Sequence, residues 1–391
     1  MLSNIIVLVI VAITDAYSIH KPILSNVLQS SSQTALSASS RREILRDSLV
    51  TASILLGQPM ISSTIMDENP KTILMTGANS GIGFEASKLL LDAGHTLILP
   101  CRTFDKAVAT AQRLDSEKTN RVIPAECNLA DLSSIEKFSK ELPSILSSGK
   151  KLDIMCLNAG IARATSATDV ARTQDGFELT VGTNHLGHFY LNSLMLPFLD
   201  SKARIVVTAS SVHDPQSPGG AQGQTATLGD LSGLERDGAN FEMVDGGSFN
   251  ADKAYKDSKL CNVLFFRELQ KRLSISPDTQ GISVNAFTPG LIVSTGLFRD
   301  QPKLFTKIFD IAATDILKVG ETPEWGGSAL AYMTGVTTKG LYYYSAPGSS
   351  KYGQSAFGNQ FSPSSVSIEG QDEAKGKKLW ELSAKLVGIP V

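Results

Sequence analysis

Short apolar runs alternate with segments of helical periodicity along most of the chain. The apolar runs cover residues 72–75, 96–100, 121–126, 153–157, 204–209 and 282–287. Helical spacing of apolar positions follows over residues 81–93, after Asp105, and over 131–142, 183–199, 255–273 and 379–387. Apolar strands that alternate with helices indicate a parallel sheet covered on both faces. The pattern predicts an α/β fold of the doubly wound, Rossmann-type class, with one domain over residues 69–391.

One segment interrupts this alternation before the helix at 255–273. Residues 213–252 are rich in Gly, Pro, Ser, Asp and Gln and show no clear periodicity. Such a long irregular stretch is uncommon inside a compact domain and is usually functional or disordered. We expect an inserted loop here. Near the C-terminus, the tyrosine run at 342–344 favours an edge strand over a pocket wall.

The first 68 residues have the composition of a targeting leader. Residues 5–13 are an unbroken apolar run, too short to span a bilayer as a helix but typical of a signal-peptide core. Residues 17–42 lack acidic side chains and are dense in Ser, which is typical of a transit peptide. A signal-like part (1–18) followed by a transit-like part (19–68) predicts delivery to a plastid, the chloroplast, through the secretory route. Arg41–Arg42 before the apolar patch at 49–56 leaves the thylakoid lumen as a less favoured destination.

Composition excludes several classes of function. The chain has 42% hydrophobic and 19% charged residues and a formal net charge of -2, so it offers no broad positive field for nucleic acid. Its 4 cysteines are scattered without the spacing of a zinc site or a disulfide framework. We therefore expect no nucleic-acid partner and no bound metal.

A glycine-rich loop joins the first strand to the first helix. Its predicted cofactor-binding residues are Gly77, Asn79, Ser80, Gly81, Ile82 and Gly83. Glycines at this spacing let the backbone approach a pyrophosphate, and the unpaired N–H groups of a helix N-terminus favour an anion. The loop therefore predicts a dinucleotide site.

The residue after the second strand selects the cofactor. An NAD enzyme places Asp or Glu there to bind the ribose 2′-hydroxyl. This chain has Arg102 instead, with Lys106 as a second cation nearby. A cation suits the 2′-phosphate, so NADPH is the expected cofactor.

Tyr255 and Lys259 are the predicted catalytic pair. A spacing of i and i+4 puts both on one face of a helix, where an ammonium lowers the pKa of the phenol and helps it exchange a proton. Ser211 follows the fifth strand and is the predicted hydrogen-bond partner of the reacting group. Asn184 opens the long helix at 183–199 and is expected to anchor a water relay to Lys259.

Together these motifs resemble the short-chain dehydrogenase/reductase family over residues 71–296. The resemblance implies that Asn158–Ala159–Gly160, which follow the fourth strand, flank the cofactor. It also places Asn128 and Leu129 beside the adenine, where Asn128 replaces the acid that the family commonly has, and Pro289 at the cofactor.

A narrower resemblance is to the light-dependent protochlorophyllide reductases. It rests on residues 175–179 (Asp-Gly-Phe-Glu-Leu), 182–189 (Gly-Thr-Asn-His-Leu-Gly-His-Phe), 228–234, 245–247, 253–259, 295–299 and 379–388. The resemblance implies reduction of a tetrapyrrole double bond with hydride from NADPH and light absorbed by the pigment. It also implies that the insertion at 213–252 is a lid or a pigment-pocket loop.

The chain departs from these reductases at the predicted pocket. Where they have Tyr-Pro-Gly-Cys, this chain has Thr288, Pro289, Gly290 and Leu291. Leu291 cannot donate a proton, and Thr288 is much smaller than tyrosine. Residues 158–162 likewise match ordinary short-chain dehydrogenases.

Three functions follow from these observations. The first is NADPH-dependent reduction of protochlorophyllide or a tetrapyrrole-like substrate in chlorophyll synthesis. The second is a carbonyl or retinol-type NADPH reductase, which Leu291 favours. The third is a catalytically quiet NADPH-sensing plastid protein, against which the Tyr255–Lys259 pair argues. Peripheral association with a plastid membrane and self-association as a homo-oligomer are further expectations.

Overall fold

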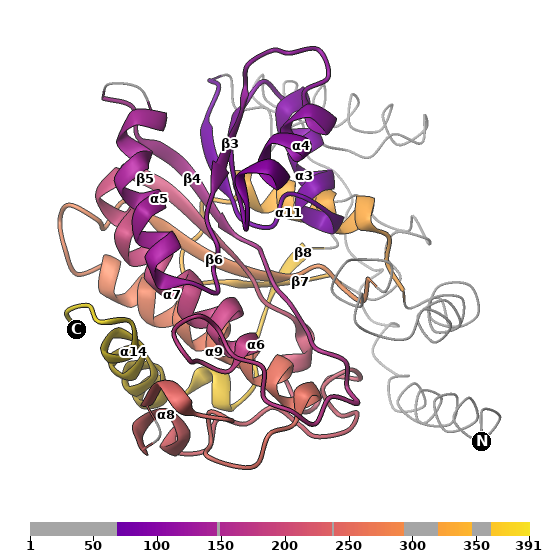
Figure 1. Cartoon of the computed structure of the whole chain (residues 1–391), viewed down its shortest axis with the longest axis vertical. Coiled ribbons are helices and arrows are strands. Elements are labelled where there is room, and N and C mark those ends of the chain that lie inside the picture. Colours follow the sequence, from indigo (N-terminus) through magenta and orange to yellow (C-terminus); the bar gives the residue numbers. More distant parts are fainter. Residues whose placement is uncertain (1–68, 147–148, 237, 293–319, 346–360) are drawn as a thin grey trace, which may run out of the picture. The chain divides into compact units, whose positions relative to one another are not determined.

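The computed structural model describes residues 69–146, 149–236, 238–292, 320–345 and 361–391. The leader predicted over residues 1–68 lies outside them, as does the motif at 295–299. The core of the domain is an eight-stranded sheet with the order β3-β2-β1-β4-β5-β6-β7-β8 (Figure 1). Its strands are β1 (Thr72–Met75), β2 (Thr96–Cys101), β3 (Val122–Glu126), β4 (Leu152–Leu157), β5 (Leu199–Thr208), β6 (Ser283–Thr288), β7 (Tyr342–Ser345) and β8 (Phe361–Ser364).

The strand order is that of a doubly wound sheet. All pairs from β3 through β7 are parallel, and only β8 runs antiparallel, against β7. The order reverses between β1 and β4, and the carboxyl ends of these strands therefore border the crevice in which such folds bind ligands. The inner strands are almost wholly apolar, and Ile73, Leu74 and Met75 of β1 are fully buried.

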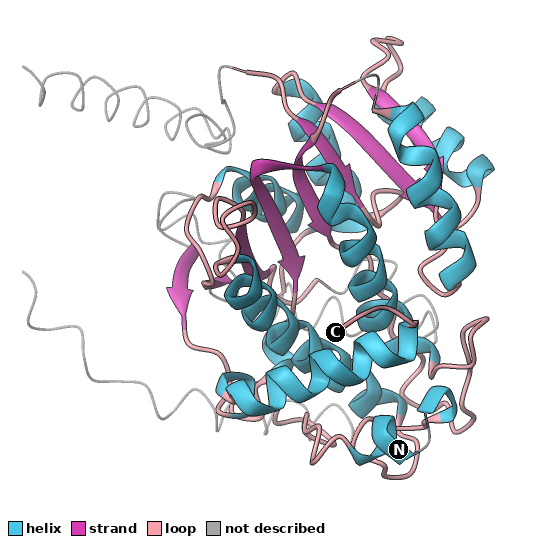
Figure 2. Cartoon of the chain, turned by 90° about the vertical axis from the view of Figure 1, so that its left-hand side faces the viewer, coloured by secondary structure: helices cyan, strands magenta, loops and turns pink. Residues whose placement is uncertain are grey.

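Helices cover both faces of the sheet (Figures 1 and 2). One face carries α3 (Gly81–Asp92), α4 (Phe104–Leu114) and α11 (Pro323–Gly335); the other carries α5 (Leu132–Ile145), α7 (Gly187–Met195) and α9 (Ala251–Leu273), with α14 (Glu373–Val387) packed on α9. Gly326 and Gly327 let α11 approach α3 closely, because a Cβ at Gly327 would lie 2.8 Å from the backbone nitrogen of Ala86. The fold class predicted from the sequence is confirmed.

Three local predictions need correction. The tyrosine run forms β7, which is not an edge strand, because β8 pairs with it on the outer side. The helix predicted at 183–199 begins earlier, with α6 (Leu179–Val181), and contains a π-helical turn, η1 (Gly182–Leu186). The sequence pattern also missed α11, because Pro323 and a pair of glycines resemble breaking signals.

The insertion at 213–252 is folded onto the domain. It contains α8 (Ser232–Arg236) and the short turn η4 (Gly238–Asn240). Eight of its apolar side chains are buried: Ala226, Leu228, Leu231, Leu234, Phe241, Met243, Val244 and Ala251. Phe241 stacks on Phe177 with the ring centroids 6.5 Å apart. The insertion is thus a packed part of the domain.

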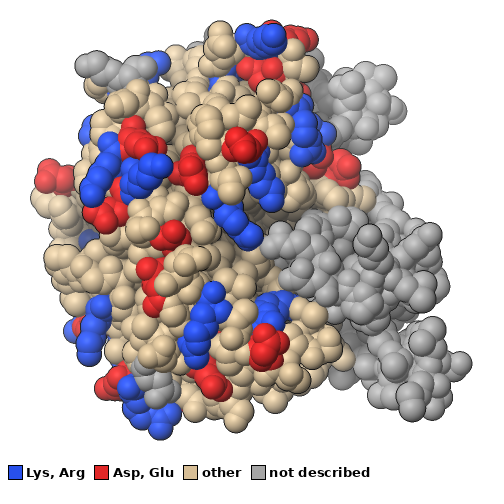
Figure 3. Space-filling view, in the orientation of Figure 1, with Lys and Arg blue, Asp and Glu red and all other residues tan. Residues whose placement is uncertain are grey.

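On the face shown in Figure 3, basic and acidic side chains are interspersed, without a broad patch of one sign. None of the helices that the structure describes is long and apolar enough to cross a membrane.

Candidate active site

The loops at the carboxyl ends of the strands surround a cavity of about 760 Å³. Every residue predicted to bind the cofactor lines this cavity: Gly77, Asn79, Ser80, Gly81, Ile82, Gly83, Arg102, Asn128, Leu129, Asn158, Ala159, Gly160, Tyr255, Lys259 and Pro289. Two predicted catalytic residues, Asn184 and Ser211, are not part of the lining. The topology thus gathers predicted residues from six separate segments into one site.

The loop after β1 requires glycine for steric reasons. Gly77 and Gly81 have φ angles of +71° and +57°, in the left-handed region. A Cβ at Gly83 would lie 2.4 Å from the carbonyl oxygen of Gly77, and one at Gly77 would lie 2.8 Å from the Cα of Ala159. The side chain of Ser80, the N-cap of α3, makes no capping hydrogen bond. The first turn of α3 therefore presents its N–H groups to the cavity, where a pyrophosphate fits.

Thr76 ties this loop to the neighbouring strand. Its hydroxyl oxygen accepts hydrogen bonds from the backbone nitrogens of Asn158 (2.9 Å) and Ala159 (3.0 Å). The side-chain amide of Asn158 donates to the carbonyl of Thr76 (3.0 Å), and its oxygen accepts from the hydroxyl of Thr208 (3.2 Å). Asn158 thus holds three strand ends together at the floor of the cavity. Sequence reasoning missed Thr76, although it directly precedes the glycine motif.

His188 links this floor to Asn184. Its Nδ1 lies 3.1 Å from the carbonyl oxygen of Asn184, and its Nε2 lies 3.0 Å from the hydroxyl oxygen of Thr76. Burial lowers the pKa of His188 to about 4, so the ring is neutral at pH 7. Because a carbonyl can only accept, Nδ1 carries the proton and Nε2 accepts from Thr76. Sequence reasoning missed this role of His188, because it depends on a contact with Thr76, which is 112 residues away in the chain.

The side chain of Asn184 holds the backbone beside the cavity. Its Oδ1 accepts from the nitrogen of Ile161 (2.8 Å), and its Nδ2 donates to the carbonyl of Ile161 (2.9 Å) and to Oγ of Ser258 (3.0 Å). The hydroxyl of Ser258 in turn donates to the carbonyl of Tyr255 (2.6 Å). Asn184 therefore positions the loop after β4 against the catalytic helix. The water relay to Lys259 stays a prediction.

Tyr255 and Lys259 lie together on α9, as the spacing predicts. The Nζ atom of Lys259 is 5.6 Å from the centroid of the Tyr255 ring and donates to the carbonyl of Thr208 (3.1 Å). Burial lowers the pKa of Lys259 to about 8. Burial also raises the pKa of Tyr255, and a hydrogen bond with Ser210 offsets this only in part. The expected lowering of the phenol pKa is therefore wrong here, and Tyr255 is a neutral phenol able to donate a proton.

The two serines after β5 are placed differently with respect to the cavity. Ser210 lines the cavity and hydrogen-bonds to Tyr255. The backbone of Ser210 is extended (φ -160°), and Ser211 begins the short turn η3 (Ser211–His213). The backbone nitrogen of Ser211 donates to the hydroxyl of Thr288 (3.2 Å). Ser211 is not among the residues that line the cavity, and its role at the reacting group stays a prediction.

Arg102 and Lys106 line the far end of the cavity, beyond β2, and both are exposed. The backbone nitrogen of Lys106 donates to the hydroxyl of Thr103, the N-cap of α4, at 3.4 Å. This cationic end matches the 2′-phosphate of NADPH. Asn128 also lines this part of the cavity, but its Oδ1 accepts from the nitrogen of Ala130 (3.2 Å). The side-chain oxygen of Asn128 thus already accepts a hydrogen bond within a local turn.

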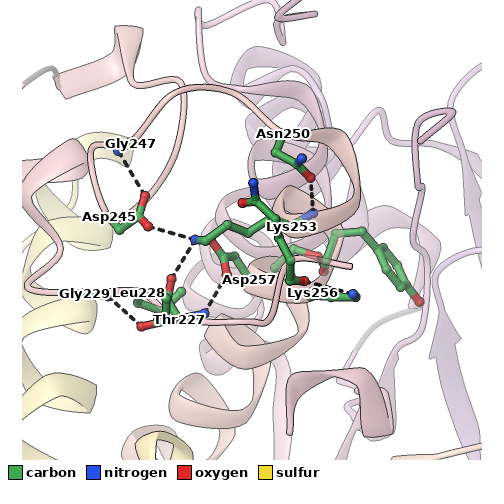
Figure 4. A network of polar contacts seen from close by, with 12 residues as sticks. Thr227, Leu228, Gly229, Asp245, Gly247, Asn250, Lys253, Lys256 and Asp257 are labelled. Atoms are coloured by element: carbon green, nitrogen blue, oxygen red, sulfur yellow. Dashed lines mark hydrogen bonds and ion pairs between the residues drawn. The ribbon is translucent and has the colours of Figure 1, made fainter. Parts of the chain in front are cut away.

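The insertion is fastened to the catalytic helix by a buried ion-pair network (Figure 4). The Nζ atom of Lys253 contacts Oδ2 of Asp257 (2.5 Å), Oδ2 of Asp245 (2.9 Å) and the carbonyl of Thr227 (2.8 Å). The other carboxylate oxygen of Asp257 accepts from the nitrogen of Thr227 (3.0 Å). The predicted lid role of the insertion stays a prediction, since none of the cavity-lining residues described here belongs to residues 213–252.

A glycine-rich anion site and a Ser–Tyr–Lys group at the end of a doubly wound sheet define a nicotinamide-dependent oxidoreductase, and NADPH is the cofactor that the site fits. Residues 71–222 match the family model of the short chain dehydrogenases. The chain is 35% identical to the chloroplast protochlorophyllide reductase of Cucumis sativus, over 81% of this chain and 78% of that protein. The identity is 36% to the enzyme of Chlamydomonas reinhardtii, over 82% and 79%.

An uncharacterised protein from Mycobacterium paratuberculosis shares the fold with a TM-score of 0.57 and 26% identity, over 82% of this chain and 95% of that one. The chain belongs to the short-chain dehydrogenase family. The relatives are named chloroplastic, in agreement with the plastid destination predicted from the leader.

Proposed function

We propose that this protein is an NADPH-dependent, light-driven reductase of protochlorophyllide or of a closely similar tetrapyrrole. The observation that carries the proposal is the intact Ser210–Tyr255–Lys259 group in a cavity of about 760 Å³, within a chain that matches protochlorophyllide reductases over four-fifths of its length. A cavity of this size accommodates a nicotinamide and part of a large ring. The substrate is a hydrophobic pigment, not a nucleic acid.

The residues of this chain would act mainly by positioning and protonation. Bound NADPH would supply the hydride for one carbon of the ring double bond. Tyr255, held neutral by burial, would donate the proton to the other carbon. Lys259 would bind the nicotinamide ribose, while Ser210 would orient the phenol. Asn184 and His188 would keep the loop after β4 and the glycine loop in register with α9.

The test is single-turnover photoreduction by the purified full-length chain. Protochlorophyllide and NADPH are mixed in the dark and then illuminated, and chlorophyllide is followed by its absorbance. We expect a pigment complex in the dark and product only after light. Tyr255→Phe should retain NADPH binding and lower product yield per flash by about 10²-fold or more. Absence of both complex and product in the wild-type protein would refute the proposal.

A second candidate is a dark carbonyl reductase, favoured by two observations. Leu291 lines the cavity in place of a proton-donating side chain, and Ser210 hydrogen-bonds to Tyr255, as protonation of an alkoxide requires. Dark oxidation of NADPH by a panel of retinal-like aldehydes would support this candidate. It would also have to disappear in Tyr255→Phe.

The location and the associations of the protein complete the proposal. The leader composition supports delivery to the plastid in two steps, first by residues 1–18 and then by residues 19–68. A peripheral position on a plastid membrane and a homo-oligomeric state stay predictions. Fusions of residues 1–18 and 1–68 to a fluorescent protein would separate the two steps by the compartment that each reaches.

A further inference from the structure

The cavity carries more positive charge than the phosphates of the cofactor need. Five cationic residues line it (Arg102, Lys106, Arg163, Arg172 and Lys259), and no Asp or Glu occurs among the described residues of the lining. The phosphates of NADPH would occupy the N-terminus of α3 and the Arg102 end. Cations at the opposite end therefore face a different anion.

Arg163 lies at the catalytic end. It follows Ile161 by two residues, and the backbone of Ile161 is held by both hydrogen bonds to Asn184. The guanidinium carbon of Arg163 is 5.7 Å from the ring centroid of Phe249, which precedes α9 and Tyr255 by a few residues. The insertion and the loop after β4 meet at this arginine.

The carboxylate that pairs with Arg163 is exposed. Arg163 is 16% exposed, and its guanidinium donates to both carboxylate oxygens of Asp169 (3.1 Å each) and to the backbone carbonyl of the same residue, whose side chain is 77% exposed. The buried carboxylate of Glu178 also interacts electrostatically with this cation. An exposed carboxylate is well hydrated and holds a cation weakly. The guanidinium of Arg172 instead donates to backbone carbonyls of Gly176 (2.7 Å) and Asn240 (3.0 Å) and so ties the insertion to the loop before α6. Arg163 is therefore the cavity-lining cation whose ion pair a carboxylate of the ligand can replace.

We propose that Arg163 is a carboxylate-binding subsite at the catalytic end of the cavity, and that it exchanges Asp169 for an acidic side chain of the substrate. The inference rests on the proposed function. Protochlorophyllide carries a free propionate on the ring that is reduced, so a ring double bond placed beside Tyr255 brings this carboxylate to the same end. A planar guanidinium binds a carboxylate through two parallel hydrogen bonds.

The test compares protochlorophyllide with its propionate methyl ester. Each pigment is titrated in the dark into the full-length chain with NADPH, and binding is read from pigment fluorescence. The wild-type protein should bind the acid about tenfold more tightly than the ester, as one charge-assisted pair implies. Arg163→Met should lower the affinity for the acid to that for the ester and leave ester binding unchanged. Arg163→Lys should retain part of the preference.

The control is Asp169→Asn, which removes the competing carboxylate and should leave acid binding unchanged or tighter. If acid and ester lose affinity equally in Arg163→Met and Asp169→Asn, the pair only shapes the loop, and the subsite is refuted. Equal binding of acid and ester by the wild-type protein, with photoreduction intact, overturns the subsite alone. If the wild-type protein binds neither pigment, the proposed function fails, and the assignment of Arg163 to this carboxylate fails with it.

Discussion

The loop after β1 is built from contacts with adjacent strands, whereas the insertion at 213–252 is fixed by polar contacts with residues far along the chain. In the loop, a Cβ added at Gly77 would lie 2.8 Å from the Cα of Ala159, just after β4, so that only glycine fits there. In the insertion, the nitrogen of Leu228 donates to Glu369 (2.8 Å), and Glu235 pairs with Lys378 (2.8 Å). The first region is specified by shape and a short motif, the second by charges that only the fold brings together.

The largest effect on cofactor binding should come from Gly83→Ala. The new Cβ would lie 2.4 Å from the carbonyl oxygen of Gly77 and 2.7 Å from Nδ2 of Asn158, and neither can move without disturbing the loop. We expect NADPH affinity to fall by about 100-fold or more, measured by NADPH fluorescence. Gly376→Ala is the matched control, since its nearest neighbours are 3.8 Å away. Unchanged NADPH affinity in Gly83→Ala would show that shape does not specify this region.

For the insertion, the corresponding change is Lys253→Met in α9, which removes the ion pair that fastens the insertion to this helix. It leaves the carboxylate of Asp257 buried without its ammonium partner, in a site where the lysine is 9% exposed. Burial acts to lower the pKa of Lys253, but the ion pairs with Asp257 and Asp245 outweigh it and raise this pKa. We expect a loss of about 3–5 kcal/mol in the free energy of unfolding, measured by denaturant titration.

Lys377→Met is the control for this prediction. Lys377 and Glu381 form an ion pair at 3.9 Å on the surface of α14, with 67% and 44% of the side chains exposed. Removing this lysine should change the free energy of unfolding by no more than about 0.5 kcal/mol. Similar losses in the two variants would contradict the view that buried charge holds the insertion in place.

A comparison of two adjacent serines, Ser210 and Ser211, tests which hydroxyl acts on Tyr255. Ser210→Ala removes the hydroxyl that bonds to Tyr255 and should lower kcat by about 10²-fold with little change in NADPH binding. Ser211→Ala should stay within about twofold of the wild-type protein, because Ser211 does not line the cavity. The reverse order of these two rates would restore the sequence-based assignment.

Arg102→Ala should weaken cofactor binding less than Gly83→Ala does. Arg102 is exposed, so its pair with the 2′-phosphate is partly screened by water. We expect KM for NADPH to rise about tenfold and KM for NADH to stay constant. Equal increases in KM for NADPH and NADH would show that Arg102 does not bind the 2′-phosphate.

Most of the cofactor site could be predicted from the sequence. The glycine motif, Arg102 and the Tyr255–Lys259 spacing are local patterns, and the topology brings all of them to one cavity. The substrate end was harder to predict. The choice between Ser210 and Ser211 depends on which of two adjacent side chains faces the cavity, and the role of His188 depends on contacts with Thr76 and Asn184. No spacing in the sequence carries that information.

The sequence by itself determined the doubly wound fold, the dinucleotide loop and the catalytic pair. Each follows from side-chain periodicity or from steric demands between residues close in the chain. The tertiary structure decided which serine lies beside Tyr255, how the insertion is fastened to α9, and that the carboxylate paired with Arg163 is exposed. These features depend on burial and on distances between remote residues, which set the strength of a charge or a hydrogen bond and exist only once the chain has folded.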